Sequence, residues 1–241
     1  MALPLRVEVL KMKSAAFSLS LAMMAAAPVP GEGQISGDTE LTYFGRSSFK
    51  IRTRSGFVLY VDPYAPGDYS EAADLVLVSH GHSDHNAVGK VTRKKECKVI
   101  APVGAVENMA VATIAEGDTR SVGPVSIRAV GAANGNHPRG FGVGYVLSFE
   151  GIVLYYSGDT SRLPEMAKWT EYGIDYALIC SDGFWNMGAE EVARCATLMG
   201  ARRLLPIHTS KDGIYDDTVA RSVKFKETII VQPGSKLALK K

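Results

Sequence analysis

Cysteine is scarce in this chain of 241 residues, which contains only Cys97, Cys180 and Cys195. Their number is odd, their spacing is scattered and no Cys-x-x-Cys pair occurs, so no disulfide framework or cysteine-based motif is indicated. Cys97 opens one apolar run, Cys180 closes another, and Cys195 falls within a helical pattern. We therefore expect all three to be small buried side chains rather than metal ligands or nucleophiles.

An excess of charge of either sign is also lacking. The net charge is +2, and charged residues make up 22% of the chain against 46% hydrophobic residues. This is the ordinary balance of a globular protein, and it argues against disorder and against a coiled coil. A near-neutral chain without a basic block gives no argument for a nucleic-acid partner or for an acidic membrane surface.

No apolar run is long enough to span a bilayer comfortably, so no stable membrane insertion is expected. An uncharged, mainly apolar stretch, residues 14–27, follows the basic residues Arg6, Lys11 and Lys13 and ends in small residues before Pro28. That order is typical of a secretory signal peptide. We predict that residues 1–30 are a signal peptide and that the protein is exported, either to the periplasm or out of the cell. The alternative is an N-terminal extension packed on the domain of a cytoplasmic protein.

Repeats, low-complexity segments and linkers are absent as well, so residues 38–241 are predicted to form one domain. Most of this segment reads as short strands bounded by turn residues. The predicted strands are residues 41–43, 48–53, 57–61, 75–79, 125–130, 144–149, 152–157, 176–179, 204–207 and 228–231. Helices are predicted at residues 103–115 and 189–199, the second with Gly200 as its stop. Because the helices separate groups of strands, we expect an α/β fold of two packed sheets covered outside by helices.

Ligand-type side chains gather at the end of the predicted strand 75–79. This strand runs directly into His80-Gly81-His82-Ser83-Asp84-His85. Histidine and aspartate are ligands that Zn²⁺ and similar divalent ions take, and small residues between them let a tight loop aim its side chains at one point. A solvated polar loop is the alternative, but four ligand-type residues in six positions argue against it.

The two remaining histidines also lie where loop ligands should lie. His137 comes just before the predicted hairpin of strands 144–149 and 152–157, and His208 directly follows strand 204–207. Asp159 follows the hairpin. Alone, it would be read as a turn or helix-capping residue. With five histidines and Asp84 already assembled, a bridging carboxylate is the better interpretation.

These motifs together resemble the metallo-β-lactamase superfamily. Finer features are similar to its branch of L-ascorbate-6-phosphate lactonase-like metal-dependent hydrolases. These features are the segments Leu41 to Gly45, Val61 to Tyr64, Asn134 to Pro138, Gly142 to Val146 and Pro206 to His208. The resemblance extends from about Leu41 to His208. It implies a four-layer αββα sandwich, the metallo-β-lactamase fold, with metals at the edge of the sheets.

The resemblance also implies two divalent metal ions, Zn²⁺ or alternatively Mn²⁺ or Fe²⁺. One ion would be held by His80, His82 and His137, and the second by Asp84, His85 and His208, with Asp159 as the bridge between them. Two such cations share a water, lower its pKa and polarise the substrate. We therefore expect a hydrolase that uses a metal-bridging hydroxide on an ester-like bond of a small molecule, either a lactone or a phosphodiester. Asp84 and Asp159 are its candidate catalytic residues, because either carboxylate can relay a proton.

Three features remain open at this point. Asp62 either accepts a hydrogen bond from a ligand imidazole or is a turn residue before Pro63. Arg46 stands where the branch often has a histidine, and it either binds an anionic substrate group or is a solvated loop residue. Phe184 and Trp185, in the loop 181–188, form either a wall for the substrate or ordinary packing.

Other functions are compatible with the same fold. One is a β-lactamase, which export would suit. Another is a metal-binding or redox protein without hydrolytic activity. Flavodiiron proteins share the sandwich but commonly replace a histidine of the cluster with an acidic residue, whereas residues 80, 82 and 85 are all histidine here. The near-neutral charge argues against a role in nucleic-acid processing, and the complete ligand set argues against a purely structural member.

Overall fold

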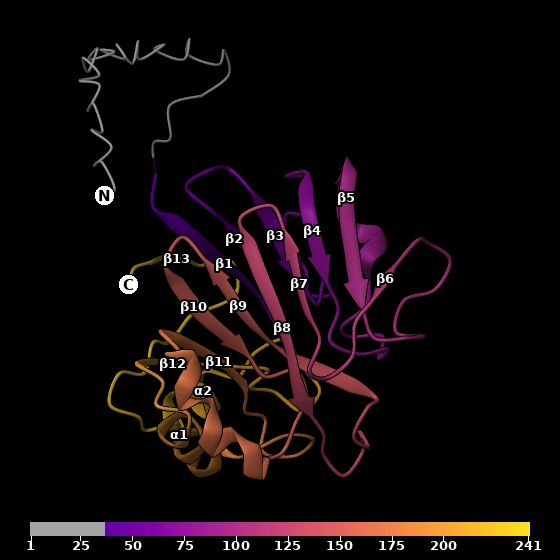
Figure 1. Ribbon diagram of the computed structural model, residues 1–241. Helices are drawn as coiled ribbons and strands as arrows, with labels where there is room; N and C mark the ends of the chain where they lie inside the picture. The colour runs from indigo at the N-terminus through magenta and orange to yellow at the C-terminus, as the bar shows by residue number, and fades with distance from the viewer. Residues whose placement is uncertain (1–36) are drawn as a thin grey trace, which may run out of the picture. The chain divides into compact units, whose positions relative to one another are not determined.

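The computed structural model describes residues 37–241, so the predicted signal segment, residues 1–30, lies outside the described residues (Figure 1). Two mixed β-sheets face one another. The first sheet has the spatial order β13 (Lys236–Leu239), β1 (Thr39–Gly45), β2 (Ser48–Arg52), β3 (Val58–Val61), β4 (Ala73–Leu77), β5 (Arg93–Ala101) and β6 (Ala112–Thr113). The second has the order β12 (Arg203–Ile207), β11 (Tyr176–Cys180), β10 (Ile152–Tyr156), β9 (Gly142–Phe149), β8 (Val125–Ala132) and β7 (Thr119–Val122).

The main hydrophobic core lies between the two sheets. In β8 the side chains of Val125, Ile127 and Ala129 are buried, whereas the intervening Ser126 and Arg128 are exposed. This alternation is what a strand with one face on a core requires. Strand β11 and residues 75–77 of β4 are buried on both faces, which explains why their sequences are continuous apolar runs.

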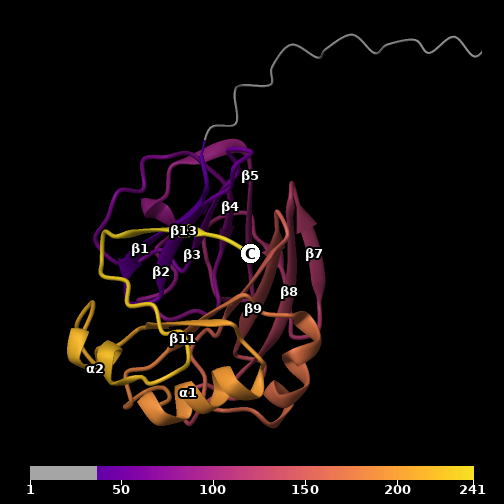
Figure 2. The same ribbon diagram turned by 90° about the vertical axis from the view of Figure 1, so that its left-hand side faces the viewer.

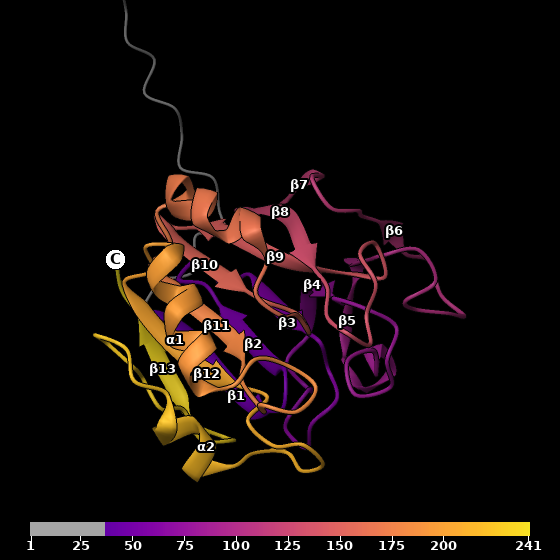
Figure 3. The same ribbon diagram turned by 90° about the horizontal axis from the view of Figure 1, so that it is seen from below.

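The outer face of the second sheet is covered by α1 (Ala189–Leu198) and by the 3₁₀ helix η2 (Pro164–Tyr172). Figures 2 and 3 show α1 lying across β11 and its neighbours. Val192, Cys195, Ala196 and Met199 share one buried face of α1, at the spacing that an amphipathic helix requires. The predicted helix 189–199 is therefore confirmed. Among residues 37–241, no helix is long and apolar enough to cross a membrane.

The outer face of the first sheet is covered mainly by loops and by the 3₁₀ helix η1 (Val88–Lys90). The predicted helix 103–115 is wrong, because this segment forms turns and the short strand β6. Val103 is 84% exposed, and Gly104 and Asn108 have positive φ angles, which a right-handed helix cannot contain. The remaining helix, α2 (Asp217–Ser222), begins after Asp216, whose side chain accepts a hydrogen bond from the amide of Val219.

Two smaller predictions also need correction. Residues 228–231, predicted to be a strand, form only an isolated parallel β-bridge, between Thr228 and Leu204. Cys97 is only half-buried, because it lies in the highly charged first half of β5, which stays outside the core. Cys180 and Cys195 are free and buried, as predicted.

Parallel pairing decides where the strand ends meet. β3 and β4 are parallel neighbours in the first sheet, and β10, β11 and β12 are parallel neighbours in the second. Parallel strands bring their carboxyl ends to the same edge, so the loops after them gather at one end of the sandwich. The side chains of the candidate metal centre lie in those loops or in the loops after β1 and β8, and Tyr156, the last residue of β10, lies beside them.

Candidate metal centre

The structure brings the predicted ligands together at this edge. Within residues 37–241, two of the three groups of side chains that could hold a metal ion match the sets that the resemblance implies, and the third combines Asp62 with His80 and His85. The first cluster contains His80, His82 and His137, whose ligand atoms all lie within 4.8 Å of one another. The second contains Asp84, His85 and His208, with the same limit. The Asp84 carboxylate lies between the two imidazoles of its cluster, because its Oδ2 is 3.8 Å from Nε2 of both His85 and His208.

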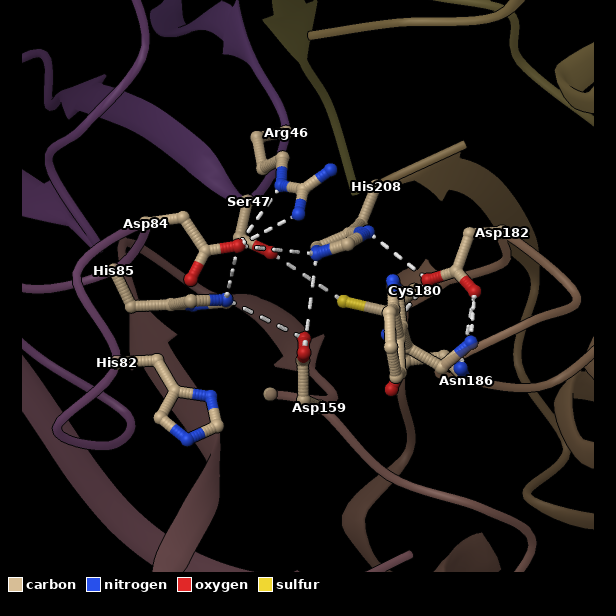
Figure 4. A network of polar contacts seen from close by, with 12 residues as sticks. Arg46, Ser47, His82, Asp84, His85, Asp159, Cys180, Asp182, Asn186 and His208 are labelled. Carbon is tan, nitrogen blue, oxygen red and sulfur yellow. Dashed lines mark hydrogen bonds and ion pairs between the residues drawn. The ribbon is translucent and has the colours of Figure 1, made fainter. Parts of the chain in front are cut away.

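Asp159 lies beside the second cluster, below Asp84 in Figure 4. Its Oδ1 is 3.6 Å from Nε2 of His85, and its Oδ2 is 3.8 Å from Nε2 of His208. The same two imidazoles therefore face both carboxylates across a short gap. These distances are longer than a hydrogen bond. The two carboxylates and the two imidazoles therefore surround a space and are not bonded directly to each other.

Several buried polar atoms facing this space lack partners. Within the described part of the chain, no hydrogen bond reaches Nε2 of His80, His85 or His208, or Oδ1 of Asp159. Buried polar atoms without partners are costly and rare in folded proteins. Imidazole nitrogens and carboxylate oxygens are ligands for Zn²⁺, Mn²⁺ and Fe²⁺. The residues present therefore fit divalent cations at both clusters.

Asp62 holds one of these imidazoles in place. Its Oδ2 accepts a hydrogen bond from Nδ1 of His85 at 2.6 Å, which turns Nε2 of that ring toward the second cluster. The same carboxylate accepts hydrogen bonds from the amide of Ser79 at 2.7 Å, from the Ser79 hydroxyl at 2.5 Å and from the hydroxyl of Tyr156. The structure thus decides between the two interpretations of Asp62: it is the acceptor for an imidazole N–H.

Asp182 lies against the corresponding ring nitrogen of His208, and the sequence analysis did not single it out. Its Oδ2 lies 3.0 Å from Nδ1 of His208, and its side chain is fully buried (Figure 4). The available signal was its position two residues after the end of the buried strand β11, close to the position that Asp62 occupies after β3. The sequence analysis of this loop considered only the aromatic residues Phe184 and Trp185, as a possible wall for the substrate.

Arg46 is neither a free anion-binding group nor a solvated loop residue. Its Nη2 and Nε lie 2.8 and 2.9 Å from Oδ2 of Asp84. Its Nη1 donates hydrogen bonds to the carbonyl oxygens of Ser210, Lys211 and Gly213, at 2.9, 3.1 and 3.1 Å. The guanidinium therefore ties the second cluster to the loop that follows His208.

The backbone around the site is strained. Among residues 37–241, five residues other than glycine have positive φ angles, and three of these are Arg46 (54°), Asp62 (42°) and His208 (46°). Each lies directly after a strand and contributes a side chain to the site. Such conformations cost roughly 1–3 kcal/mol each and persist where the surrounding structure holds them for function.

The pKa values of the buried histidines shift in opposite directions in the two clusters. Burial, followed by the neighbouring His85, lowers the pKa of His80 to about 2, and burial also lowers the pKa of His137. Burial would lower the pKa of His208 too, but the nearby carboxylates Asp159, Asp182 and Asp84 outweigh it and raise this pKa to about 9. Burial would raise the pKa of Asp84, but His208, His85 and Arg46 together hold it well below its usual range. The second cluster is therefore rich in negative charge, as a cation site needs to be.

A pocket of about 450 Å³ opens onto both clusters. Trp185 and Lys211 line this pocket, whereas Phe184 does not. Nζ of Lys211 lies 3.9 Å from the centre of the Phe184 ring. Phe141, which sequence analysis did not single out, stacks on His137 with ring centres 5.3 Å apart and an interplanar angle of 8°. One aromatic side chain, Trp185, therefore lines the pocket, and another, Phe141, packs against the first cluster.

The model of one protein family, described as a β-lactamase superfamily domain, matches residues 40–208, which include every residue of both clusters. The chain therefore belongs to the metallo-β-lactamase superfamily. Its α/β sandwich of two facing sheets with outer helices is the metallo-β-lactamase fold predicted from the sequence.

Relatives and solved structures agree with this membership. The chain is 28% identical over 228 residues to a UPF0173 metal-dependent hydrolase of Thermococcus kodakarensis, covering 83% of this chain and 99% of the relative. It is 29% identical over 236 residues to a UPF0173 metal-dependent hydrolase of Myxococcus xanthus, covering 84% of each. Igni18, a metallo hydrolase of Ignicoccus hospitalis, has a similar fold, with a TM-score of 0.69 at 21% identity over 85% of this chain and 99% of that one.

Proposed function

We propose that this protein is a metal-dependent hydrolase that holds two divalent cations and cleaves an ester-like bond of a small molecule. The observation that carries the proposal is the set of unpartnered atoms in the site. Nε2 of three buried histidines and Oδ1 of Asp159 face one space and, among the described residues, form no hydrogen bond. That arrangement has a physical reason if cations occupy the space.

His80, His82 and His137 would hold one cation, and Asp84, His85 and His208 the other, with Asp159 between them. When bound, the pair supplies an acidic water and polarises the bond to be cleaved. Asp62 and Asp182 hold the imidazoles of His85 and His208 with Nε2 turned inward. The carboxylates of Asp84 and Asp159 are the candidate groups for relaying a proton to the leaving group.

Lactones and phosphodiesters are the substrate classes that we propose. The pocket volume of about 450 Å³ suits a small-molecule substrate. The relatives from Thermococcus kodakarensis and Myxococcus xanthus are named as metal-dependent hydrolases, which supports the reaction class. The resemblance to the L-ascorbate-6-phosphate lactonase-like branch favours a lactone within that class.

Metal analysis of the purified protein tests the proposal, followed by a panel of lactones, phosphodiesters and β-lactams. We expect about two divalent cations per chain, and hydrolysis that a chelator abolishes and that Zn²⁺ or Mn²⁺ restores. Finding no bound cation after incubation with either metal would refute the two-cation centre. Turnover of β-lactams alone would replace the proposed substrate class.

A further inference from the structure

The loop between β11 and α1 is shaped by the side chain of Asp182. Oδ1 of this carboxylate accepts hydrogen bonds from the amides of Phe184, Trp185 and Asn186, at 2.7, 2.6 and 3.1 Å. Three amides converging on one buried carboxylate oxygen leave the loop little freedom. The position of Asn186 is therefore set by Asp182.

The other oxygen of Asp182 faces the second cluster. Oδ2 accepts a hydrogen bond from Nδ2 of Asn186 at 2.8 Å and lies 3.0 Å from Nδ1 of His208 (Figure 4). The imidazole of His208 and the amide of Asn186 thus share one carboxylate oxygen. A shift of the amide would move the acceptor on which the orientation of His208 depends.

The far side of the Asn186 amide faces the loop of the first cluster. Its Oδ1 accepts a hydrogen bond from Nδ2 of Asn134 at 3.3 Å, and the same nitrogen donates to the carbonyl oxygen of Trp185 at 3.1 Å. Oδ1 of Asn134 in turn accepts hydrogen bonds from the amides of Asn136 and His137, at 2.9 and 2.8 Å. Asn134 therefore fixes the backbone that carries His137.

We propose that the side chains of Asp182, Asn186 and Asn134 form a polar bridge that positions His208 and His137 together and couples cation binding at the two clusters. This inference rests on the proposed function, since it concerns the same site. The bridge runs from Nδ1 of one proposed ligand to the main chain of another, and every link in it is a recorded contact. The contact between Asp182 and His208 is an N···O approach of 3.0 Å, and the other links are hydrogen bonds. Such a chain of polar contacts between two binding sites is a physical route by which occupancy of one can favour the other.

None of the three bridge residues is a proposed ligand. They are positioning residues, which act through His208 and His137. If they served only to pack the loop, their loss would lower stability, and the losses of Zn²⁺ affinity caused at the two ends of the bridge would be independent of each other. Coupling is therefore the property to measure.

The test is a titration of the metal-free full chain with Zn²⁺ against a chelating dye. The variants are Asp182→Asn, Asn134→Ala and the double substitution. We expect each single change to lower the overall Zn²⁺ affinity by at least ~10-fold, as losses next to metal ligands usually do. Because both changes break the same bridge, the loss in the double variant should be smaller than the product of the single losses by about fivefold or more. When the same substitutions are made in a chain that also carries Asn186→Ala, the two losses of Zn²⁺ affinity should simply multiply.

Asp118→Asn is the matched control. Its carboxylate accepts a hydrogen bond from the amide of Ala115 at 3.1 Å, in a turn outside the site, so Zn²⁺ affinity should stay at the wild-type value. Losses that multiply in the double variant would overturn the bridge while leaving the two-cation centre intact. A wild-type chain that takes up no Zn²⁺ would overturn both.

Circular dichroism establishes whether the double variant folds. If it does not, Asn186→Ala alone decides, because the Asn186 side chain bonds to Asp182 and Asn134 and not to a proposed ligand. A loss of ~10-fold in both binding steps supports the bridge. Unchanged affinity in both steps overturns it.

Discussion

Arg46 and Asp84 form a close ion pair in which both Nη2 and Nε of the guanidinium contact the same carboxylate oxygen, at 2.8 and 2.9 Å. Because Nη1 is held by three carbonyl oxygens of residues 210–213, this pair joins a proposed ligand to the loop after His208. Lysine carries a single ammonium group and cannot make both sets of contacts.

Arg46→Lys should therefore leave Asp84 less well oriented, lowering Zn²⁺ affinity by ~10-fold. The measurement is a Zn²⁺ titration combined with thermal unfolding. Arg194→Lys is a suitable control, since Arg194 also pairs with a carboxylate, Glu190, but on the exposed surface of α1. That variant should match the wild type. Wild-type Zn²⁺ binding in Arg46→Lys would mean that Asp84 does not depend on Arg46.

Replacing Asp159 with Asn separates a bridging ligand from a turn residue. Asn occupies turns and caps about as well as Asp, so a turn role predicts a nearly silent change. A role between two cations predicts reduced metal content and turnover lowered by at least ~100-fold. The fold should survive, as circular dichroism can verify. Full metal occupancy and wild-type turnover would return Asp159 to the turn interpretation.

Asp62→Asn should cost stability as well as metal affinity. An Asn side chain would point an N–H group at donors that now share the buried carboxylate, which belong to Ser79, His85 and Tyr156. Asn tolerates the positive φ of this position, so the backbone is not the reason for the loss. We expect the free energy of unfolding in urea to fall by about 1–3 kcal/mol and Zn²⁺ affinity to fall ~10-fold. An unfolding curve that matches the wild type would contradict this.

Glu150 provides a pH-dependent contact far from the metal centre. Burial would raise its pKa, but hydrogen bonds from the Thr39 hydroxyl and the amides of Arg54 and Ser55 outweigh burial and hold the pKa below its usual range. A carboxyl group whose folded pKa is lowered stabilises the fold above its unfolded pKa of about 4.3, and this contribution is lost as the pH falls through the folded pKa.

Glu150→Gln should consequently be less stable than the wild type by about 1 kcal/mol at pH 7, with a smaller gap near pH 3. Urea unfolding at the two pH values measures both gaps. An equal gap at both values would show that the charge of Glu150 is not what stabilises the contact.

We also propose export, on the pattern of residues 1–30. If this segment is a signal peptide, mass spectrometry of the protein from its native host should find a mature chain that begins near Pro28. Recovery from the cytoplasm of a chain that keeps Met1 would show that the segment is retained.

Local sequence determined much of this protein. The apolar run before His80 predicts a buried strand, and the strand delivers three histidines and Asp84 into one short loop, because neighbouring residues in a chain are necessarily close. The face of α1 formed by Val192, Cys195 and Met199 is likewise a local pattern. In residues 103–115 the local pattern predicted a helix wrongly. Gly104 and Asn108 have positive φ angles there, and Val103 is exposed to solvent instead of packing on a core.

Only the tertiary structure decided which groups hold the ligands. Asp182 and His208 follow neighbouring strands, β11 and β12, and parallel pairing places them side by side. Asp62 bonds to Tyr156, 94 residues away, and Arg46 reaches the carbonyl oxygen of Ser210, 164 residues away. An aspartate or arginine in a loop has the same local signature whether it is solvated or buried against an imidazole. The difference arises from the packing of the two sheets, which brings the carboxyl ends of distant strands to one edge and excludes water from between them.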